Sequence, residues 1–121
     1  MRDGSEWARR VYAAVDAKDA DGFVSHLTEN AWFRYANADP VVGRPAIRAA
    51  VEGFFASIES LHHEITGQWQ QGDDLLLRFD VRYTRQDSRS VTVPAMTVFQ
   101  MEGELARRVQ IYVDVSPVFA P

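Results

Sequence analysis

The stretch HHEITGQWQQGDDLLLRFDVRYTRQDSRSVTVPAMTVFQMEGELARRVQIYVDVS, residues 62–116, decides the fold of this chain. Apolar and polar residues alternate along it with a period of two, which is typical of β-strands. The alternation breaks at three short polar segments, each of a length that suits a hairpin loop. The stretch therefore predicts four antiparallel strands, at 62–70, 75–85, 90–101 and 106–116.

The residues before this stretch follow a helical period instead. Trp7, Val11 and Val15 recur at the three- and four-residue spacing of one helix face. Arg44-Pro45 is typical of a helix start, because proline is tolerated in the first turn. We therefore expect helices at 5–18, 20–27 and 44–61, with a short strand at 31–36.

Helices followed by a meander of strands predict an α+β fold. In this arrangement three amino-terminal helices pack on one face of a strongly curved, mostly antiparallel sheet. A sheet that wraps around a long helix leaves a cone-shaped pocket open at one end, which suits a small molecule.

Length and composition set limits on the function. The chain has 121 residues, of which 46% are hydrophobic and 25% charged, as expected for one compact domain over residues 1–121. The absence of cysteine excludes disulfides, thiolate chemistry and cysteine-based metal sites. A net charge of −4 without blocks of like charge argues against nucleic-acid binding. No apolar run approaches the ~20 residues that cross a bilayer, so we expect a cytoplasmic protein without a membrane partner.

Three local strings add a resemblance to a known family: NAWFRY at 30–35, VGRPAIR at 42–48 and YVDVSP at 112–117. With the order of elements, they resemble the SnoaL-like branch of the nuclear-transport-factor-2-like superfamily over nearly the whole chain. The resemblance implies a cystatin-like α+β barrel and points to a homodimer. It implies several activities, because the superfamily contains polyketide cyclases, ketosteroid isomerases, epoxide hydrolases, dehydratases and non-catalytic binding domains.

Arg78 and Asp80 are the first candidate catalytic pair. They are two residues apart on a predicted strand and therefore share one face, opposite Phe79. An arginine beside a carboxylate can hold it in place and influence which of two nearby acids keeps its proton. The alternative is a row of solvent-exposed charges, because Arg82 continues the same face.

Tyr35 and Asn37 have the same spacing and can together hold a water molecule or a substrate oxygen. Alternatively, Asn37 shapes a turn and Tyr35 belongs to the core. Tyr-x-Asn combined with Arg-x-Asp is similar to the limonene-type epoxide hydrolases. That resemblance implies a water held by Tyr35 and Asn37 and an epoxide protonated by Asp80.

The family's water-activating aspartate falls at Gln110, or at Ile111 if the preceding loop differs by one residue, and neither side chain can act as a base. Asp114 is on the same face further along the strand, and we expect it to be the second catalytic carboxylate, with a role in capping the strand end as the alternative. The base of ketosteroid isomerases aligns with Tyr35, and a neutral tyrosine is a poor base near pH 7.

The remaining candidates are binding residues. His62 and His63 point to opposite faces of their strand and His26 lies on the short helix, so we expect no metal site. Five apolar or aromatic residues either line a cavity that suits an apolar ligand or belong to the core: Trp69, Met96, Val98, Phe54 and Tyr112. Asn37 and Gln110 are expected to be polar binding residues of the same cavity.

Three hypotheses follow. The first is a cofactor-independent enzyme that uses Asp80, Asp114, Arg78 and Tyr35 for cyclisation, isomerisation or epoxide opening of a small apolar substrate. The second is a non-catalytic ligand-binding module, and the third is a dimerisation domain. We expect a homodimer because apolar residues exceed what a helix-covered face needs, at Phe79, Val81, Tyr83, Val93, Phe99 and Val113.

Overall fold

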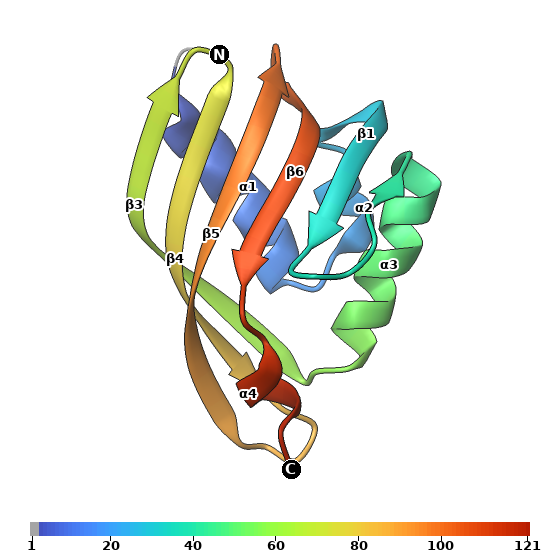
Figure 1. Ribbon diagram of the computed structural model, residues 1–121, viewed down its shortest axis with the longest axis vertical. Helices are drawn as coiled ribbons and strands as arrows, with labels where there is room; N and C mark the ends of the chain where they lie inside the picture. Colours follow the sequence, from blue (N-terminus) through green and yellow to red (C-terminus); the bar gives the residue numbers. More distant parts are fainter. Residues whose placement is uncertain (1–2) are drawn as a thin grey trace.

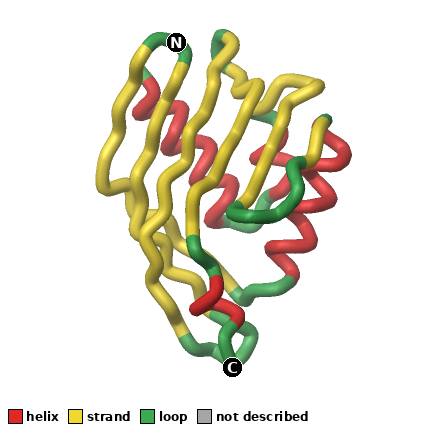
Figure 2. Tube along the Cα trace, viewed as in Figure 1, coloured by secondary structure: helices red, strands yellow, loops and turns green. Residues whose placement is uncertain are grey.

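The computed structural model describes residues 3–121. Three helices pack on one face of a single curved sheet, and a short fourth helix closes the chain near the narrow end of the molecule (Figures 1 and 2). This is the α+β arrangement that the sequence predicts. In chain order the elements are α1 (Gly4–Asp16), α2 (Ala20–Val24), β1 (Leu27–Tyr35), β2 (Val41–Val42), α3 (Arg44–Ala56), β3 (Ser60–Gln71), β4 (Asp74–Thr84), β5 (Ser90–Glu102), β6 (Leu105–Val113) and α4 (Ser116–Phe119).

The sheet has the strand order β2-β1-β6-β5-β4-β3. Strands β3 to β6 form the predicted antiparallel meander. Strand β1 then pairs with β6 in parallel, and the two-residue β2 pairs antiparallel with β1 at the edge. Helix α3 connects β2 at one edge of the sheet to β3 at the other edge. It lies at the side of the helical layer that is nearer to β1 and β2 (Figure 1).

The two faces of the sheet differ in which residues they carry. On β4 the odd-numbered residues from Leu75 to Tyr83 are buried, whereas Arg78, Asp80 and Arg82 between them are exposed. We call the side covered by α1, α2 and α3 the inner face and the opposite side the outer face. Helix α1 buries Trp7, Ala8, Val11 and Tyr12 against the inner face.

The helices begin and end where the local chemistry requires. The Asp3 carboxylate accepts a hydrogen bond from the backbone N–H of Ser5 at the start of α1, as an N-cap residue does. Helix α3 follows Gly43, whose φ of +92° favours glycine. It ends at Ala56 rather than near 61, because the chain turns there and pairs as β3 from Ser60.

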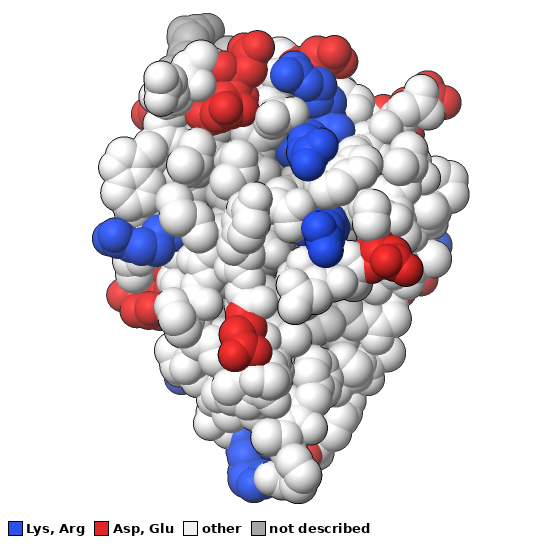
Figure 3. Space-filling model, in the orientation of Figure 1, with Lys and Arg blue, Asp and Glu red and all other residues white. Residues whose placement is uncertain are grey.

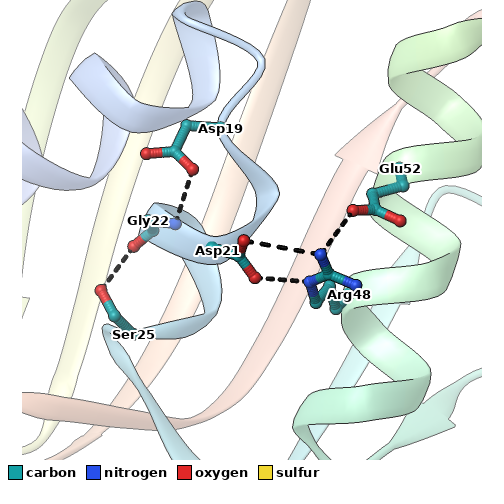
Figure 4. A network of polar contacts seen from close by, with 6 residues as sticks. All are labelled: Asp19, Asp21, Gly22, Ser25, Arg48 and Glu52. Atoms are coloured by element: carbon teal, nitrogen blue, oxygen red, sulfur yellow. Dashed lines mark hydrogen bonds and ion pairs between the residues drawn. The ribbon is translucent and has the colours of Figure 1, made fainter.

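A polar network joins α2 to α3 (Figure 4). Asp19 caps α2 by accepting from the backbone N–H of Gly22 at 2.9 Å. The Arg48 guanidinium on α3 contacts both Asp21 and Glu52, and its hydrogen bond lowers the pKa of Asp21. Because all three side chains are largely exposed, these ion pairs position the helices more than they stabilise the fold.

Several other boundaries also differ from the sequence prediction. Strand β1 begins at Leu27, where a helix was expected, and β6 ends at Val113, three residues early. The short elements β2 and α4 were not predicted, since two and four residues are too few to show a period. No helix within residues 3–121 is long and apolar enough to cross a membrane.

Candidate functional site

The inner face of the sheet and the helices enclose a cavity of about 280 Å³. Its wall is made mainly of aromatic and aliphatic side chains, with a few polar groups among them. The elements α1, α3, β1, β3, β4, β5 and β6 all contribute. The lining residues that carry polar side-chain atoms are Tyr12, Tyr35, Asp39, His63, Tyr83 and Thr97.

His63 is the ionisable side chain in this wall that is best placed for acid–base chemistry. Its Nδ1 is 2.7 Å from Oδ1 of Asp16, and its backbone N–H donates to Oδ2 of the same carboxylate at 2.9 Å. A carboxylate accepts hydrogen bonds, so Nδ1 donates to Asp16, and in the neutral form of the imidazole Nε2 is then the nitrogen with the lone pair. Among residues 3–121, no hydrogen bond engages Nε2.

Local structure explains how Asp16 and His63 meet. Asp16 is the last residue of α1, and His63 lies near the start of β3, whose inner-face residues pack under that helix. The His63 ring also packs against Tyr12 and Phe79, with centroid distances of 4.7 and 5.0 Å. The expected divergence of the two histidines is confirmed, because the side chain of His62 is 64% exposed and that of His63 only 10%.

Three tyrosine hydroxyls supply the other polar contacts of the cavity. Tyr12 donates to Oγ1 of Thr97 at 3.4 Å, and the hydroxyls of Tyr35 and Tyr83 are 2.8 Å apart. Burial is the main reason why the pKa of each of these tyrosines lies above its ordinary value. All three phenols therefore stay protonated near neutral pH, as hydrogen-bond donors.

Arg78 and Asp80 do not reach the cavity, and the prediction of a shared catalytic pocket is wrong for them. Both lie on the outer face, because Phe79 between them points into the core. The Arg78 guanidinium donates to the side chain and carbonyl of Thr66 and stacks on the Trp69 ring at 5.2 Å. These contacts give Arg78 a structural role, since they hold the bulge of β3 between residues 65 and 67.

Asp114 is also outside the cavity. Its carboxylate accepts a hydrogen bond from the backbone N–H of Ser116 at 3.0 Å, and this bond lowers its pKa. The alternative of a cap at the strand end is therefore the one observed. Asp114, Asn37 and Tyr35 together border a second, more open depression beside the cavity, and Tyr35 lines both. Asp80 is on the outer face, so the water site expected from Tyr35 and Asn37 has one carboxylate nearby and not the expected pair.

The predicted binding residues divide between the two faces. Tyr35 and Phe54 line the cavity, with ring centroids 4.9 Å apart. The other predicted binding residues do not line the cavity. On β5 and β6 the residues that line it are Ala95, Thr97 and Ile111, each one position away from a predicted binding residue. The residues placed on the wrong face are Trp69, Met96, Val98, Gln110 and Tyr112.

The sequence patterns gave no functional role to Asp16, Tyr12, Tyr83 or Thr97, and they did not distinguish His63 from the other histidines. Tyr12 and Asp16 are four residues apart on one helix face, a spacing that indicates a shared site. No group of three His, Asp or Glu side chains that could hold a metal occurs in the described part of the chain.

Comparison with known proteins shows the family of this chain. The model of the SnoaL-like domain matches residues 8–109, so the chain belongs to the SnoaL-like family. No curated protein matches the sequence.

Solved structures share the fold. An NTF2-like protein of unknown function from Burkholderia pseudomallei is 16% identical, with 99% of this chain and 100% of that chain covered and a TM-score of 0.87. A cystatin-fold protein from Novosphingobium aromaticivorans is 30% identical, with 88% and 94% covered and a TM-score of 0.73. A candidate SnoaL-like polyketide cyclase from Jannaschia is 14% identical, with 96% and 91% covered and a TM-score of 0.82.

Proposed function

We propose that this chain is a cofactor-independent enzyme that moves a proton on a small apolar carbonyl compound, with His63 as the general base. The observation that carries the proposal is the hydrogen bond of 2.7 Å between His63 Nδ1 and Asp16 Oδ1. It fixes the tautomer and the orientation of the ring, which is how a carboxylate prepares a histidine base.

The proposed reaction begins when Nε2 takes a proton from a carbon next to the carbonyl group. The electrons of the broken C–H bond move into the carbonyl, and the negative charge develops on its oxygen. Tyr35 and Tyr83 share one hydrogen bond, so one of the two phenols has its O–H free, and it then donates a hydrogen bond to this oxygen. Fixed donors at a developing oxyanion are a main source of rate enhancement.

Two outcomes use the same residues. If the protonated His63 returns its proton to another carbon, the product is an isomer. If the enolate carbon attacks a second carbonyl of the same molecule, a ring closes and the new alkoxide takes the proton. Cyclisation is supported by the candidate polyketide cyclases among the similar structures.

Hydrogen–deuterium exchange tests the proposal without a known product. Small diketones and aryl ketones are incubated in D₂O with the protein, and loss of the C–H signal is followed by NMR. The parent protein is expected to accelerate exchange. The exchange rate with His63→Gln is expected to be lower by a factor of about 10² to 10⁴, as is usual when a general base is removed.

His62→Gln is the matched control, because the neighbouring His62 is exposed and its Nδ1 is 3.6 Å from Asp16. It is expected to keep the parent's exchange rate within about threefold, since it removes no group from the cavity. Equal exchange rates in the parent and in folded His63→Gln would contradict the proposal and favour a ligand-binding module.

We also propose that the chain forms a homodimer through the outer face of the sheet. The residues first offered for this, such as Phe79 and Val93, are buried in the core, so the argument moves to other side chains. Uncharged side chains cover much of this face (Figure 3), and the exposed Tyr112 and Trp69 are of the types enriched at interface centres.

A further inference from the structure

The mouth of the cavity carries a carboxylate with no evident structural task. Asp39 is exposed and belongs to the cavity wall. Within residues 3–121, its side chain has no hydrogen bond and no ion pair. By contrast, Asp3, Asp19 and Asp114 each accept a hydrogen bond from a nearby backbone N–H.

The turn that carries Asp39 is held close to an aromatic cluster. The backbone N–H of Ala38 donates to the carbonyl of Tyr35 at 3.0 Å, which folds the turn back on the end of β1. The Tyr35 ring packs on Phe54 at 4.9 Å, and Phe54 packs on Tyr83 at 5.9 Å. These three rings and Asp39 line the same cavity.

The rest of the wall offers nothing that would bind an anion. Among the described residues that line the cavity, eight are Phe or Tyr and none is Lys or Arg. The carboxylate of Asp16 adds a second negative charge behind His63. Arg34 donates to the carbonyl of Ala38 in the same turn at 3.0 Å, but it does not line the cavity. An anionic ligand inside the cavity would lose its hydration without gaining an ionic partner in the wall, and this is costly.

From these observations we propose that the mouth of the cavity is a subsite for a substituted ammonium group, formed by Asp39 with the half-buried rings of Tyr35 and Phe54. Aromatic faces attract alkylammonium ions, and a carboxylate at the same place adds an ionic contact. The position at the mouth matters, because an exposed carboxylate lets the cation keep part of its hydration.

The inference rests on the same cavity as the proposed reaction and narrows its substrate. A substrate would place an apolar body with its carbonyl beside His63 and an amine-bearing end at Asp39. Carboxylate- and phosphate-bearing compounds would be excluded by charge.

Three probes that share a benzyl group and differ in charge test the subsite. Benzyltrimethylammonium, benzyl alcohol and phenylacetate are titrated into the protein at pH 8 and low salt by isothermal titration calorimetry. The cation is expected to bind between about fivefold and 25-fold more tightly than the alcohol, because a cation–π contact and an exposed ion pair each contribute up to about fivefold. Phenylacetate is expected to bind most weakly.

Two variants identify the residues. Asp39→Asn is expected to weaken binding of the cation by up to about fivefold, which is the usual range for an exposed ion pair, and to leave benzyl alcohol unchanged. Phe54→Leu keeps the apolar bulk but removes a ring face, so it lowers the ratio of cation to alcohol affinity. Asp80→Asn makes the same change at an exposed carboxylate on the outer face. It is expected to alter neither the affinity for the cation nor the affinity for benzyl alcohol.

Equal affinities for the three probes, an effect of Asp39→Asn on all of them alike, or no binding of benzyltrimethylammonium would each overturn the subsite. The outcome is separate from that of the proposed reaction, because His63→Gln is expected to retain the preference for the cation. Charge-selective binding without hydrogen exchange would refute the reaction alone, and exchange without charge selectivity would refute the subsite alone.

Discussion

The two faces of β4 carry opposite kinds of residue and offer opposite kinds of function. The outer face holds several charged side chains, yet Arg78 is held by hydrogen bonds to Thr66 and by the ring of Trp69. The inner face is almost entirely apolar, and its few polar neighbours are hydrogen-bonded in pairs inside a cavity. In this protein the row of charged residues therefore does not mark the cavity, and the oriented pair of Asp16 and His63 in the apolar wall is the basis of the proposed reaction.

The largest expected difference between the faces concerns catalysis. Asp16→Asn is expected to reduce the rate of hydrogen exchange by about 10² to 10⁴, because an asparagine amide can donate to Nδ1 and leave the proton on Nε2, the nitrogen needed as base. Asp80→Asn makes the same chemical change on the outer face and is expected to leave the rate unchanged. NMR exchange rates of both variants in D₂O make the comparison, and equal losses would show that the faces have been assigned wrongly.

Strand alternation explains why the fold was predictable and the site only partly so. The period of two indicates which residues share a face, and this was enough for the four-stranded meander. It does not say which face a pocket uses. On β5 both sets are largely apolar, since Met96 and Val98 alternate with Thr97 and Phe99.

On β4 the alternation did contain the answer. Phe79, Val81 and Tyr83 form a continuous apolar row, and such a row faces the core. The resemblance to epoxide hydrolases instead favoured the charged row.

The pair of Asp16 and His63 lies beyond what local patterns specify. The sequence placed His63 on one face of its strand and Asp16 near the end of a helix. Their contact spans 47 residues and depends on how α1 docks across β3, which is decided by packing of the whole core. Phe54 was found because it lies on the apolar face of its helix, whereas Tyr35 was found from its spacing to Asn37 and from the resemblance to epoxide hydrolases.

Stability gives the next largest contrast. Phe79→Ala removes a side chain that is 1% exposed and is expected to lower the free energy of unfolding by about 3 to 5 kcal/mol, through lost burial and the space left behind. Arg78→Ala next to it is expected to cost about 1 kcal/mol or less, because its hydrogen bonds are exposed. Urea unfolding monitored by circular dichroism measures both changes, and similar losses in the two variants would contradict the inner and outer assignments.

The proposed dimer tests what the outer face is for. Tyr112→Asp is expected to weaken self-association at least about tenfold, because a charge in the centre of an apolar interface loses its hydration. Val42→Asp is the control, since Val42 is equally exposed, at 59%, but lies on the edge strand β2. Sedimentation velocity at micromolar concentration gives the answer, and a parent protein that sediments only as a 13.7 kDa species would rule the dimer out.

The smallest expected effect concerns the buried phenols and appears only at alkaline pH. Burial and the neighbouring Tyr83 raise the pKa of Tyr35 in the folded state, whereas an unfolded tyrosine loses its proton near pH 10. The stability contributed by Tyr35 is thus fully present below about pH 10 and is lost as the pH rises above it, by up to about 1.4 kcal/mol per pH unit.

Tyr35→Phe, which lacks this proton, is expected to be less stable than the parent by about 1 kcal/mol at pH 7, because it lacks the hydrogen bond to Tyr83. The gap between the two proteins should narrow from pH 10 to pH 11, when both are unfolded in urea at each pH. A gap that stays constant over this range would mean that the phenol ionises as freely in the folded protein as in the unfolded chain, and that water reaches the cavity wall as it reaches the outer face.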